Sequence, residues 1–352
     1  MLSMMRGFAF ALLLGIAAAP TASAALEPVR PGQDAFITRA VYASGRLWLL
    51  TDAGILSSLA PGEAHRTVEA VSQPVFDICS RGDTVVAVTG ARDKSGPWTI
   101  RRSPDWSVVA TVPRGGDGSA AMLCSGSSIQ VLTARRLLSV TAASTKALDL
   151  IGTLGPGNIA SILATPASIY VGFDAGEWGG GLRRIDRSTG KISVVASNAS
   201  GGLCGGPLNT DCDPVNGLAA MPGRPGCIAA AIGLVHFASH GRIDVICGDR
   251  VRELYVKPLG GQPPGTPPRG MDPYITVAFY SLIASGETLW SAGVDGIYAI
   301  DALGKARKTP IPAFQTVDGV AVSFALPHLV VVVTEAGRRN SVSTGAPLLV
   351  AR

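Results

Sequence analysis

The apolar residues of this chain fall in short runs separated by glycine, aspartate and serine, and one arrangement of these runs recurs. The clearest copies are IYVGFDAGEWGGGLRRIDRSTGKISVVAS, from Ile169, and LWSAGVDGIYAIDALGKARKTPI, from Leu289. In both, Gly-Leu or Gly-Ile opens a run that ends in Ile-Asp, and Gly-Lys follows where a hairpin needs a residue with positive φ. Weaker copies start near Leu47, Thr84, Ile129, Ile228 and Leu329. The pattern predicts a repeated unit of β-strands.

The length of the repeat indicates the architecture. Four of the six spacings between starts fall between 37 and 45 residues, close to the ~40–45 residues of a four-stranded propeller blade. A strand of small residues, such as FDICS or IASILA, precedes most copies, and small side chains suit the innermost strand, where blades converge. The chain thus resembles the seven-bladed β-propeller superfamily, which implies an all-β fold of seven four-stranded antiparallel blades. Six blades with an irregular end, or a double β-sandwich, are the alternatives.

Composition agrees with an all-β chain. The 43 glycines and 24 prolines interrupt the sequence too often for long helices, while 47% hydrophobic residues provide for a large core. The formal net charge is +5, with 16% charged residues and no cluster of lysine and arginine. Nucleic-acid binding requires a dense basic face, so we expect no nucleic-acid partner.

The first 24 residues have the pattern of a secretory signal. Arg6 precedes an apolar run from Phe8 to Ala19, and the small triplet Ala22, Ser23 and Ala24 follows. The run is too short to cross a membrane. The sequence therefore predicts a signal peptide over 1–24, a single propeller domain over 25–352 with no membrane span after cleavage, and a periplasmic or secreted protein.

Six cysteines in an exported chain predict disulfides. Cys204 and Cys212 are close in sequence and are expected to pair, as are Cys79 and Cys124, which end the innermost strands of adjacent blades. Cys227 and Cys247 are placed at the start of a second strand and the end of a fourth strand. Because a third strand would separate them, we expect no bond between these two.

Two joins between blades are unusually long, about 198–214 and about 253–273. In propellers such joins project on the same face as the loops between second and third strands, so the GFDAGEWGGG segment is expected beside them. Long loops on a rigid repeat scaffold are where binding usually resides. The candidate ligand-binding residues are Asp174, Glu177, Trp178, Asn209, Asp211 and Asp213. The alternatives are a rim-covering role for Trp178 and a disulfide-pinned turn at NTDCD.

Four polar residues open predicted innermost strands: Asp117, Asn158, Asn216 and Asp318. Oxygen ligands converging from different blades suit a hard divalent cation such as Ca²⁺. Asn216-Gly-Leu-Ala and Asp318-Gly-Val-Ala are similar to strand openings of the gluconolactonase family, which implies a metal-assisted lactonase site. The alternative is that Asp/Asn-Gly simply forms the turn before each inner strand.

Two functions follow from these observations, and a structural part of an envelope assembly is a third alternative. The first is an exported recognition module that binds a protein partner or a small ligand on the face with the long loops. The second is a metal-dependent, lactonase-like hydrolase that uses the axial Asp/Asn ring. Trp48 and Trp290 occupy matching places in their repeats and are expected to be buried.

Overall fold

The computed structural model describes residues 37–60, 63, 65–115, 121–126, 128–141, 144–198, 206–235, 239–259, 275–311, 320–326, 329–334 and 348–351. All described residues belong to one compact unit, residues 34–352. The predicted signal peptide, residues 1–24, lies outside the described residues.

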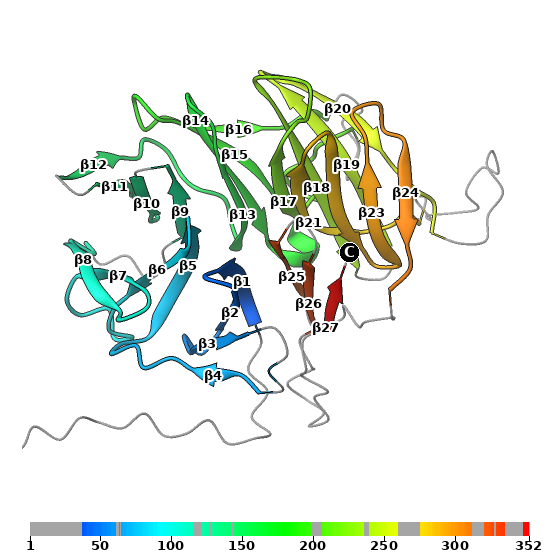
Figure 1. Cartoon of the computed structure of the whole chain (residues 1–352). Helices are drawn as coiled ribbons and strands as arrows, with labels where there is room; N and C mark the ends of the chain where they lie inside the picture. The colour runs from blue at the N-terminus through cyan, green and yellow to red at the C-terminus, as the bar shows by residue number, and fades with distance from the viewer. Residues whose placement is uncertain are drawn as a thin grey trace, which may run out of the picture. The chain divides into compact units, whose positions relative to one another are not determined.

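The compact unit is built of antiparallel sheets in which strands consecutive in sequence are neighbours (Figure 1). The first three sheets are β1 (Ile37–Ala43), β2 (Arg46–Thr51), β3 (Leu56–Leu59) and β4 (Thr67–Val68); β5 (Val75–Arg81), β6 (Thr84–Thr89), β7 (Trp98–Arg102) and β8 (Ser107–Val112); and β9 (Ala121–Ser125), β10 (Ser128–Leu132), β11 (Arg136–Val140) and β12 (Thr145–Asp149).

The next three sheets are β13 (Asn158–Ala164), β14 (Ser168–Asp174), β15 (Gly180–Asp186) and β16 (Ile192–Val195); β17 (Val215–Ala220), β18 (Cys227–Val235), β19 (Ser239–Cys247) and β20 (Arg250–Tyr255); and β21 (Phe279–Ser285), β22 (Thr288–Gly293), β23 (Gly296–Ile300) and β24 (Ala306–Thr309). The last sheet is β25 (Val320–Leu326), β26 (Leu329–Thr334) and β27 (Leu348–Ala351). Within the described ranges the only helix is the 3₁₀ turn η1 (Gly176–Trp178).

The fold is therefore an all-β propeller, as predicted, but the predicted number of four-stranded blades is wrong. The described residues form six four-stranded blades, and the C-terminal sheet has three strands. The repeat from Leu329 lacks both the Ile-Asp end and the Gly-Lys turn that mark the third strand and its hairpin in the clear copies.

The innermost strands are joined to one another by hydrogen bonds from side chains to the neighbouring backbone. Asp77 of β5 accepts the Met122 N–H of β9 at 2.6 Å, and the Ser161 hydroxyl of β13 donates to the Val215 carbonyl of β17 at 2.8 Å. Ser323 of β25 accepts the Ala40 N–H of β1 at 3.1 Å, so the first and last sheets are also bonded. Figure 1 shows β1 and β25 as neighbours although they lie at opposite ends of the chain.

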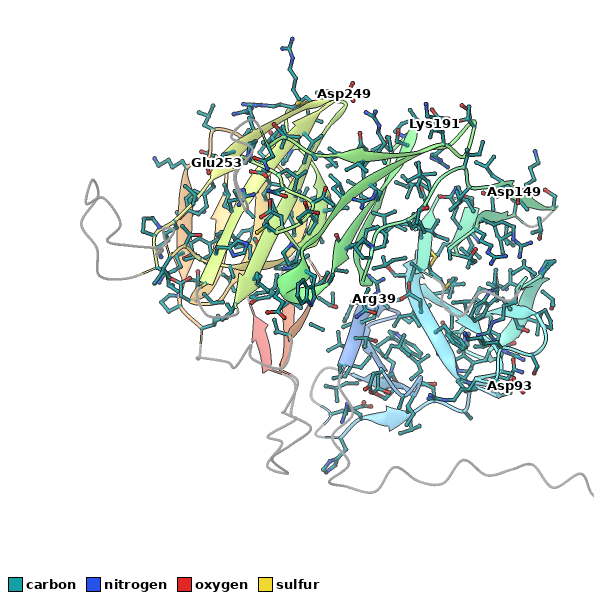
Figure 2. All side chains as sticks on the ribbon, turned by 180° about the vertical axis from the view of Figure 1, so that it is seen from behind. Arg39, Asp93, Asp149, Lys191, Asp249 and Glu253 are labelled. Atoms are coloured by element: carbon teal, nitrogen blue, oxygen red, sulfur yellow. A yellow bond between two sulfur atoms is a disulfide. The ribbon has the colours of Figure 1, made fainter. Side chains whose placement is uncertain are left out.

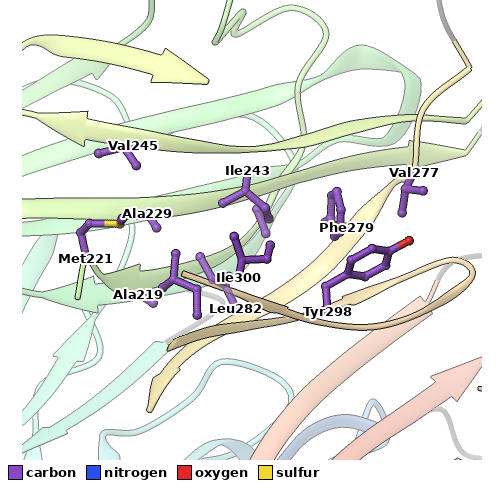
Figure 3. Close-up of a cluster of buried hydrophobic side chains, with 12 residues drawn as sticks. Ala219, Met221, Ala229, Ile243, Val245, Val277, Phe279, Leu282, Tyr298 and Ile300 are labelled. Atoms are coloured by element: carbon purple, nitrogen blue, oxygen red, sulfur yellow. The ribbon is translucent and has the colours of Figure 1, made fainter. Parts of the chain in front are cut away.

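Hydrophobic side chains fill the spaces between adjacent sheets. One such cluster lies between the β17–β20 and β21–β24 blades and includes Ala229, Ile243, Phe279 and Tyr298, as Figure 3 shows. Second strands such as β6 are buried on both faces, whereas outer strands such as β24 are largely exposed. This gradient explains why the repeats are apolar early and polar late in each unit.

Trp48 and Trp290 are each the third residue of the second strand of a blade, as their equivalent places in the repeats predicted. Trp48 is buried, and its indole N–H donates to the Ala43 carbonyl at 3.0 Å. Trp290 is only half-buried and packs against the small cluster of Ala292 and Ile297, as do Val320 and Phe324 of β25. The predicted burial is therefore confirmed for Trp48 alone.

The disulfides confirm one prediction and contradict another. Cys79 and Cys124 are bonded, with Cα atoms 5.8 Å apart, and link β5 to β9. Cys227 and Cys247 are also bonded, with Cα atoms 4.4 Å apart, because β18 and β19 are nine-residue partners in which these cysteines face each other. The prediction that they are unbonded is wrong: Cys247 ends the third strand. Cys212 is disulfide-bonded, and its predicted partner, Cys204, lies outside the described residues.

Candidate functional site

Five innermost strands carry a β-bulge near the same point, close to their first residues. The register shifts at Thr38, Phe76, Ala160 and Asn216 in four of these strands, and in β21 Tyr280 and Ser281 together lie opposite one residue of the second strand. A bulge changes the direction of the side chains around it, and such features are frequent next to functional sites. One cavity is lined by a residue from each of these bulges: Thr38, Phe76, Ala160, Asn216 and Tyr280.

This cavity, the axial pocket, has a volume of about 750 Å³. Its lining comes from the first strand of every sheet, including β1, β9, β21 and β25, and from the loops that follow several second strands. Among the lining groups are Arg39, Asp52, Asp77, Arg92, Asn158 and Asp174. The pocket therefore opens on the face that carries the loops between second and third strands.

Asn158 and Asp174 meet at the wall of the axial pocket. Asn158 begins β13 and is paired with Asp174 at the end of β14. Paired residues of an antiparallel sheet project on the same face, with Cβ atoms ~4.5–5.5 Å apart. Burial raises the pKa of the Asp174 carboxyl, while its hydrogen bond from the Gly176 N–H acts in the opposite direction. The pocket thus brings together a predicted ligand-binding residue and a predicted metal ligand.

An ion pair not predicted from the sequence also lies in the wall of the axial pocket. Arg39 of β1 donates through Nε and Nη2 to the two carboxylate oxygens of Asp77 at 3.0 and 3.1 Å. The Asp77 carboxylate raises the pKa of Arg39. Asp77 also accepts the Ile78 N–H, so this carboxylate is fully engaged. Figure 2 shows Arg39 beside the inner strands.

Asn216 has a structural role within the pocket wall. Its side-chain amide donates to the carbonyl oxygens of Gly233, at 2.7 Å, and Phe279, at 3.1 Å. These bonds join β17 to its own second strand and to the next blade. Asp117 and Asp318, the two acidic members of the predicted metal set, lie outside the described residues. The described part of the chain contains no group of three or more His, Cys, Asp or Glu side chains arranged to hold a metal ion.

The long join before β17 is folded around buried polar groups. The Asp213 side chain is fully buried and accepts hydrogen bonds from Arg242 Nη2 and from the Asn209 N–H, the latter at 2.6 Å. Asn209 is buried, and its Oδ1 accepts the Asp211 N–H at 3.0 Å. Asp211 is exposed. Of these three predicted ligand-binding residues, only Asp211 is therefore presented to solvent.

The glycine-rich turn packs against this join, as its predicted position implied. Gly180 N–H donates to the Thr210 carbonyl at 3.0 Å, and Gly181 N–H donates to the Asp213 carbonyl at 2.9 Å. A Cβ on Gly179 would lie 2.4 Å from the Thr210 oxygen. The glycines therefore leave room for the backbone of the join before β17. Trp178, in η1, is 74% exposed, and Glu177 is exposed beside it.

A second polar cluster was not predicted and lies beneath the same join. His240, Arg242 and Asp244 alternate along β19 and therefore share one face of the sheet. Arg242 Nε lies 3.6 Å from Asp244 Oδ2, and His240 Nε2 lies 3.7 Å from Asp213 Oδ1. Burial is the main cause that raises the pKa of Asp244, and the charge of Asp213 adds to it. The alternation of these polar residues along an otherwise apolar strand is the sequence signal that could have revealed the cluster.

Comparison with solved structures shows the fold. The chain is similar to YCF48 bound to D1 peptide, with 12% identity, a TM-score of 0.53, and coverage of 85% of this chain and 89% of that one. It is similar to U3-55K, with 10% identity, a TM-score of 0.55, and coverage of 92% and 97%. It is also similar to the Neurospora crassa Pan2 WD40 domain, with 11% identity, a TM-score of 0.53, and coverage of 87% and 88%.

No family model matches the chain, and no curated protein matches it in sequence. The resemblance to the gluconolactonase family is therefore not supported: Asn216 is bonded to backbone carbonyls, and its expected counterpart Asp318 lies outside the described residues.

Across the described ranges, no helix is long and apolar enough to cross a membrane.

Proposed function

We propose that this protein is an exported recognition module that binds a protein partner or a small ligand on its looped face, with the axial pocket at the centre of the site. The pocket carries this proposal. Its volume of about 750 Å³ falls within the ~300–1,000 Å³ typical of ligand pockets. Its wall combines apolar side chains with charged and polar groups, which can fix the orientation of a ligand.

Three further observations support the proposal. Register shifts near the start of five first strands place Thr38, Phe76, Ala160, Asn216 and Tyr280 at the pocket. The exposed Trp178 and Asp211 stand on loops of the same face, where an aromatic side chain can anchor a partner. Among similar folds, YCF48 has been solved with a bound peptide.

Export is part of the same proposal. The Cys79–Cys124 and Cys227–Cys247 disulfides suit an oxidising compartment, and the first 24 residues have the pattern of a signal peptide. The domain that remains, residues 25–352, is then periplasmic or secreted. Sequencing the N-terminus of the protein recovered outside the cytoplasm would test this, and an N-terminus at Met1 would contradict it.

A fragment-soaking experiment tests the binding site. We expect small fragments to occupy the axial pocket of the unmodified protein and to be excluded by Ala160→Trp, because Ala160 lines the pocket. The matched control is Ala147→Trp on the exposed outer strand β12, which should leave occupancy unchanged. A pocket that takes up no fragment, or one that Ala160→Trp leaves equally occupied, would overturn the proposal.

A further inference from the structure

Among the described residues, the carboxylate of Asp174 has no charged partner at the wall of the axial pocket. Within the described residues, its one hydrogen bond is accepted from the Gly176 N–H at 2.7 Å. Desolvation by burial is the main cause that raises the pKa of Asp174, and no basic side chain of the described residues offsets it. A half-buried carboxylate of this kind gains when a cation takes the place of the lost water.

Asn158 supplies a second acceptor beside it. The two residues are strand partners, so their side chains project from the same face of the blade, and both line the pocket. The side-chain amide of Asn158 makes no hydrogen bond to another residue in the described ranges, and Asn158 is exposed at the pocket. A carboxylate and an amide oxygen can accept two N–H groups of one ammonium or guanidinium group.

The rest of the pocket favours a cation over an anion. The charged side chains of the lining are those of Asp52, Asp77 and Asp174 and of Arg39 and Arg92. Because Asp77 and Arg39 are paired with each other, Asp52 and Asp174 are left against Arg92. Arg39 is engaged by Asp77 through two hydrogen bonds. Arg92 is exposed and donates to the Ala53 carbonyl.

The remaining lining suits a carbon chain. Leu154, Ile159 and Phe173 lie in the same wall as the Asn158–Asp174 pair, and Tyr280 lines the pocket from the β21–β24 blade. Apolar surface of this kind buries methylene groups favourably. Aromatic rings also attract cations within ~6 Å of their faces.

We propose that the axial pocket binds its ligand through an ammonium or guanidinium group held by Asp174 and Asn158, with the aliphatic part of the ligand against the apolar lining. This inference rests on the proposed function of the pocket as a binding site. The cation belongs either to a free small amine or to a lysine or arginine side chain of a protein partner.

Isothermal titration of residues 25–352 with cadaverine, pentanediol and glutarate tests the charge requirement. These probes have a five-carbon chain with ammonium, hydroxyl or carboxylate ends. We expect cadaverine to bind and the other two not to bind. Asp174→Asn should weaken cadaverine binding at least about tenfold, since hydrogen bonds to charged groups contribute ~1.5–3 kcal/mol. Asp149→Asn, on the outer strand β12, is the matched control and should leave the affinity unchanged.

A blocked tripeptide with arginine at its centre distinguishes the two sources of the cation. Peptide binding that is tighter than cadaverine binding, and is weakened by Asp174→Asn, assigns the cation to a protein partner. Tighter binding of cadaverine assigns it to a free amine. Either result supports the inference.

Asn158→Ala provides a second variant if Asp174→Asn fails to fold, and it should also weaken binding. The inference is overturned if neither cation binds, if pentanediol or glutarate binds as tightly as cadaverine, or if the pocket variants bind cadaverine as the unmodified protein does. Fragments that occupy the pocket in that case would leave the proposed binding function standing, whereas an empty pocket would remove both.

Discussion

Two groups of acidic residues on the looped side of this propeller differ in what surrounds them. Asp174 lies at the wall of an open pocket with one backbone hydrogen bond. Asp213 and Asp244 are fully buried next to Arg242, beneath the join before β17. The ligand-binding residues predicted from the sequence include one of each kind: Asp174 at the open pocket and Asp213 in the buried cluster. The difference shows that a carboxylate is available to bind a ligand only where it is not already paired with the protein's own cations and amide groups.

The largest effect is expected from Arg242→Ala. This change leaves the buried Asp213 and Asp244 without their shared guanidinium, and breaking a buried pair in this way typically costs ~3–5 kcal/mol of the free energy of unfolding. The control is Arg184→Ala, which removes an ion pair to the exposed Asp249 and should cost ~1 kcal/mol or less. Urea denaturation measures both. Equal losses of unfolding free energy for the two variants would show that the pairing of Arg242 with Asp213 and Asp244 does not stabilise the join before β17.

A smaller effect is expected from the two asparagines of the pocket wall. Asn216→Ala removes both donors to the Gly233 and Phe279 carbonyls and should cost ~1–3 kcal/mol of the free energy of unfolding. Asn158→Ala removes no hydrogen bond to a described residue and should leave that free energy nearly unchanged. The same denaturation experiment compares them, and a larger loss for Asn158 would reverse the roles assigned here.

The smallest effect depends on pH. Burial and the charges of Asp213 and Glu253 raise the pKa of Asp244 in the folded protein, against the opposing charge of Arg242. The contribution of Asp244 to stability is therefore fully present below its unfolded pKa and is lost as the pH rises through the folded pKa. Asp244→Asn should raise the Tm relative to the unmodified protein more at about pH 8 than at about pH 5. Asp249→Asn, at an exposed site, should show no such trend. A gain for Asp244→Asn that is independent of pH would argue against a raised pKa.

The fold was largely predictable because the repeats combine apolar runs with glycine turns. The error in the β17–β20 blade has a physical cause. A third strand was expected between Cys227 and Cys247, but the described residues of this segment form only β18 and β19. Gly233 and Gly241 lie inside these two strands, where the backbone around Ala278 comes close: a Cβ on Gly233 would lie 2.4 Å from the Phe279 nitrogen. Glycine in a strand can mark such an approach as well as a turn. Splitting this hairpin moved Cys247 onto the wrong strand.

The candidate site was only partly predictable. Asn158 and Asp174 were identified separately, but their pairing depends on the register of β13 with β14. Arg39 and Asp77 come from different repeats and meet where bulges redirect the first strands. Register shifts of this kind leave little mark in a single sequence, because they depend on the neighbouring strand.

Carboxyl labelling with a carbodiimide and glycinamide, read by mass spectrometry on the folded protein, tests the contrast between the two groups most directly. Asp174 should be labelled, as should the exposed controls Asp149 and Asp211, because a small reagent can enter the axial pocket. Asp213 and Asp244 should remain unlabelled until the protein unfolds. Protection of Asp174 together with labelling of Asp244 would contradict the assignment of the open and the sealed site.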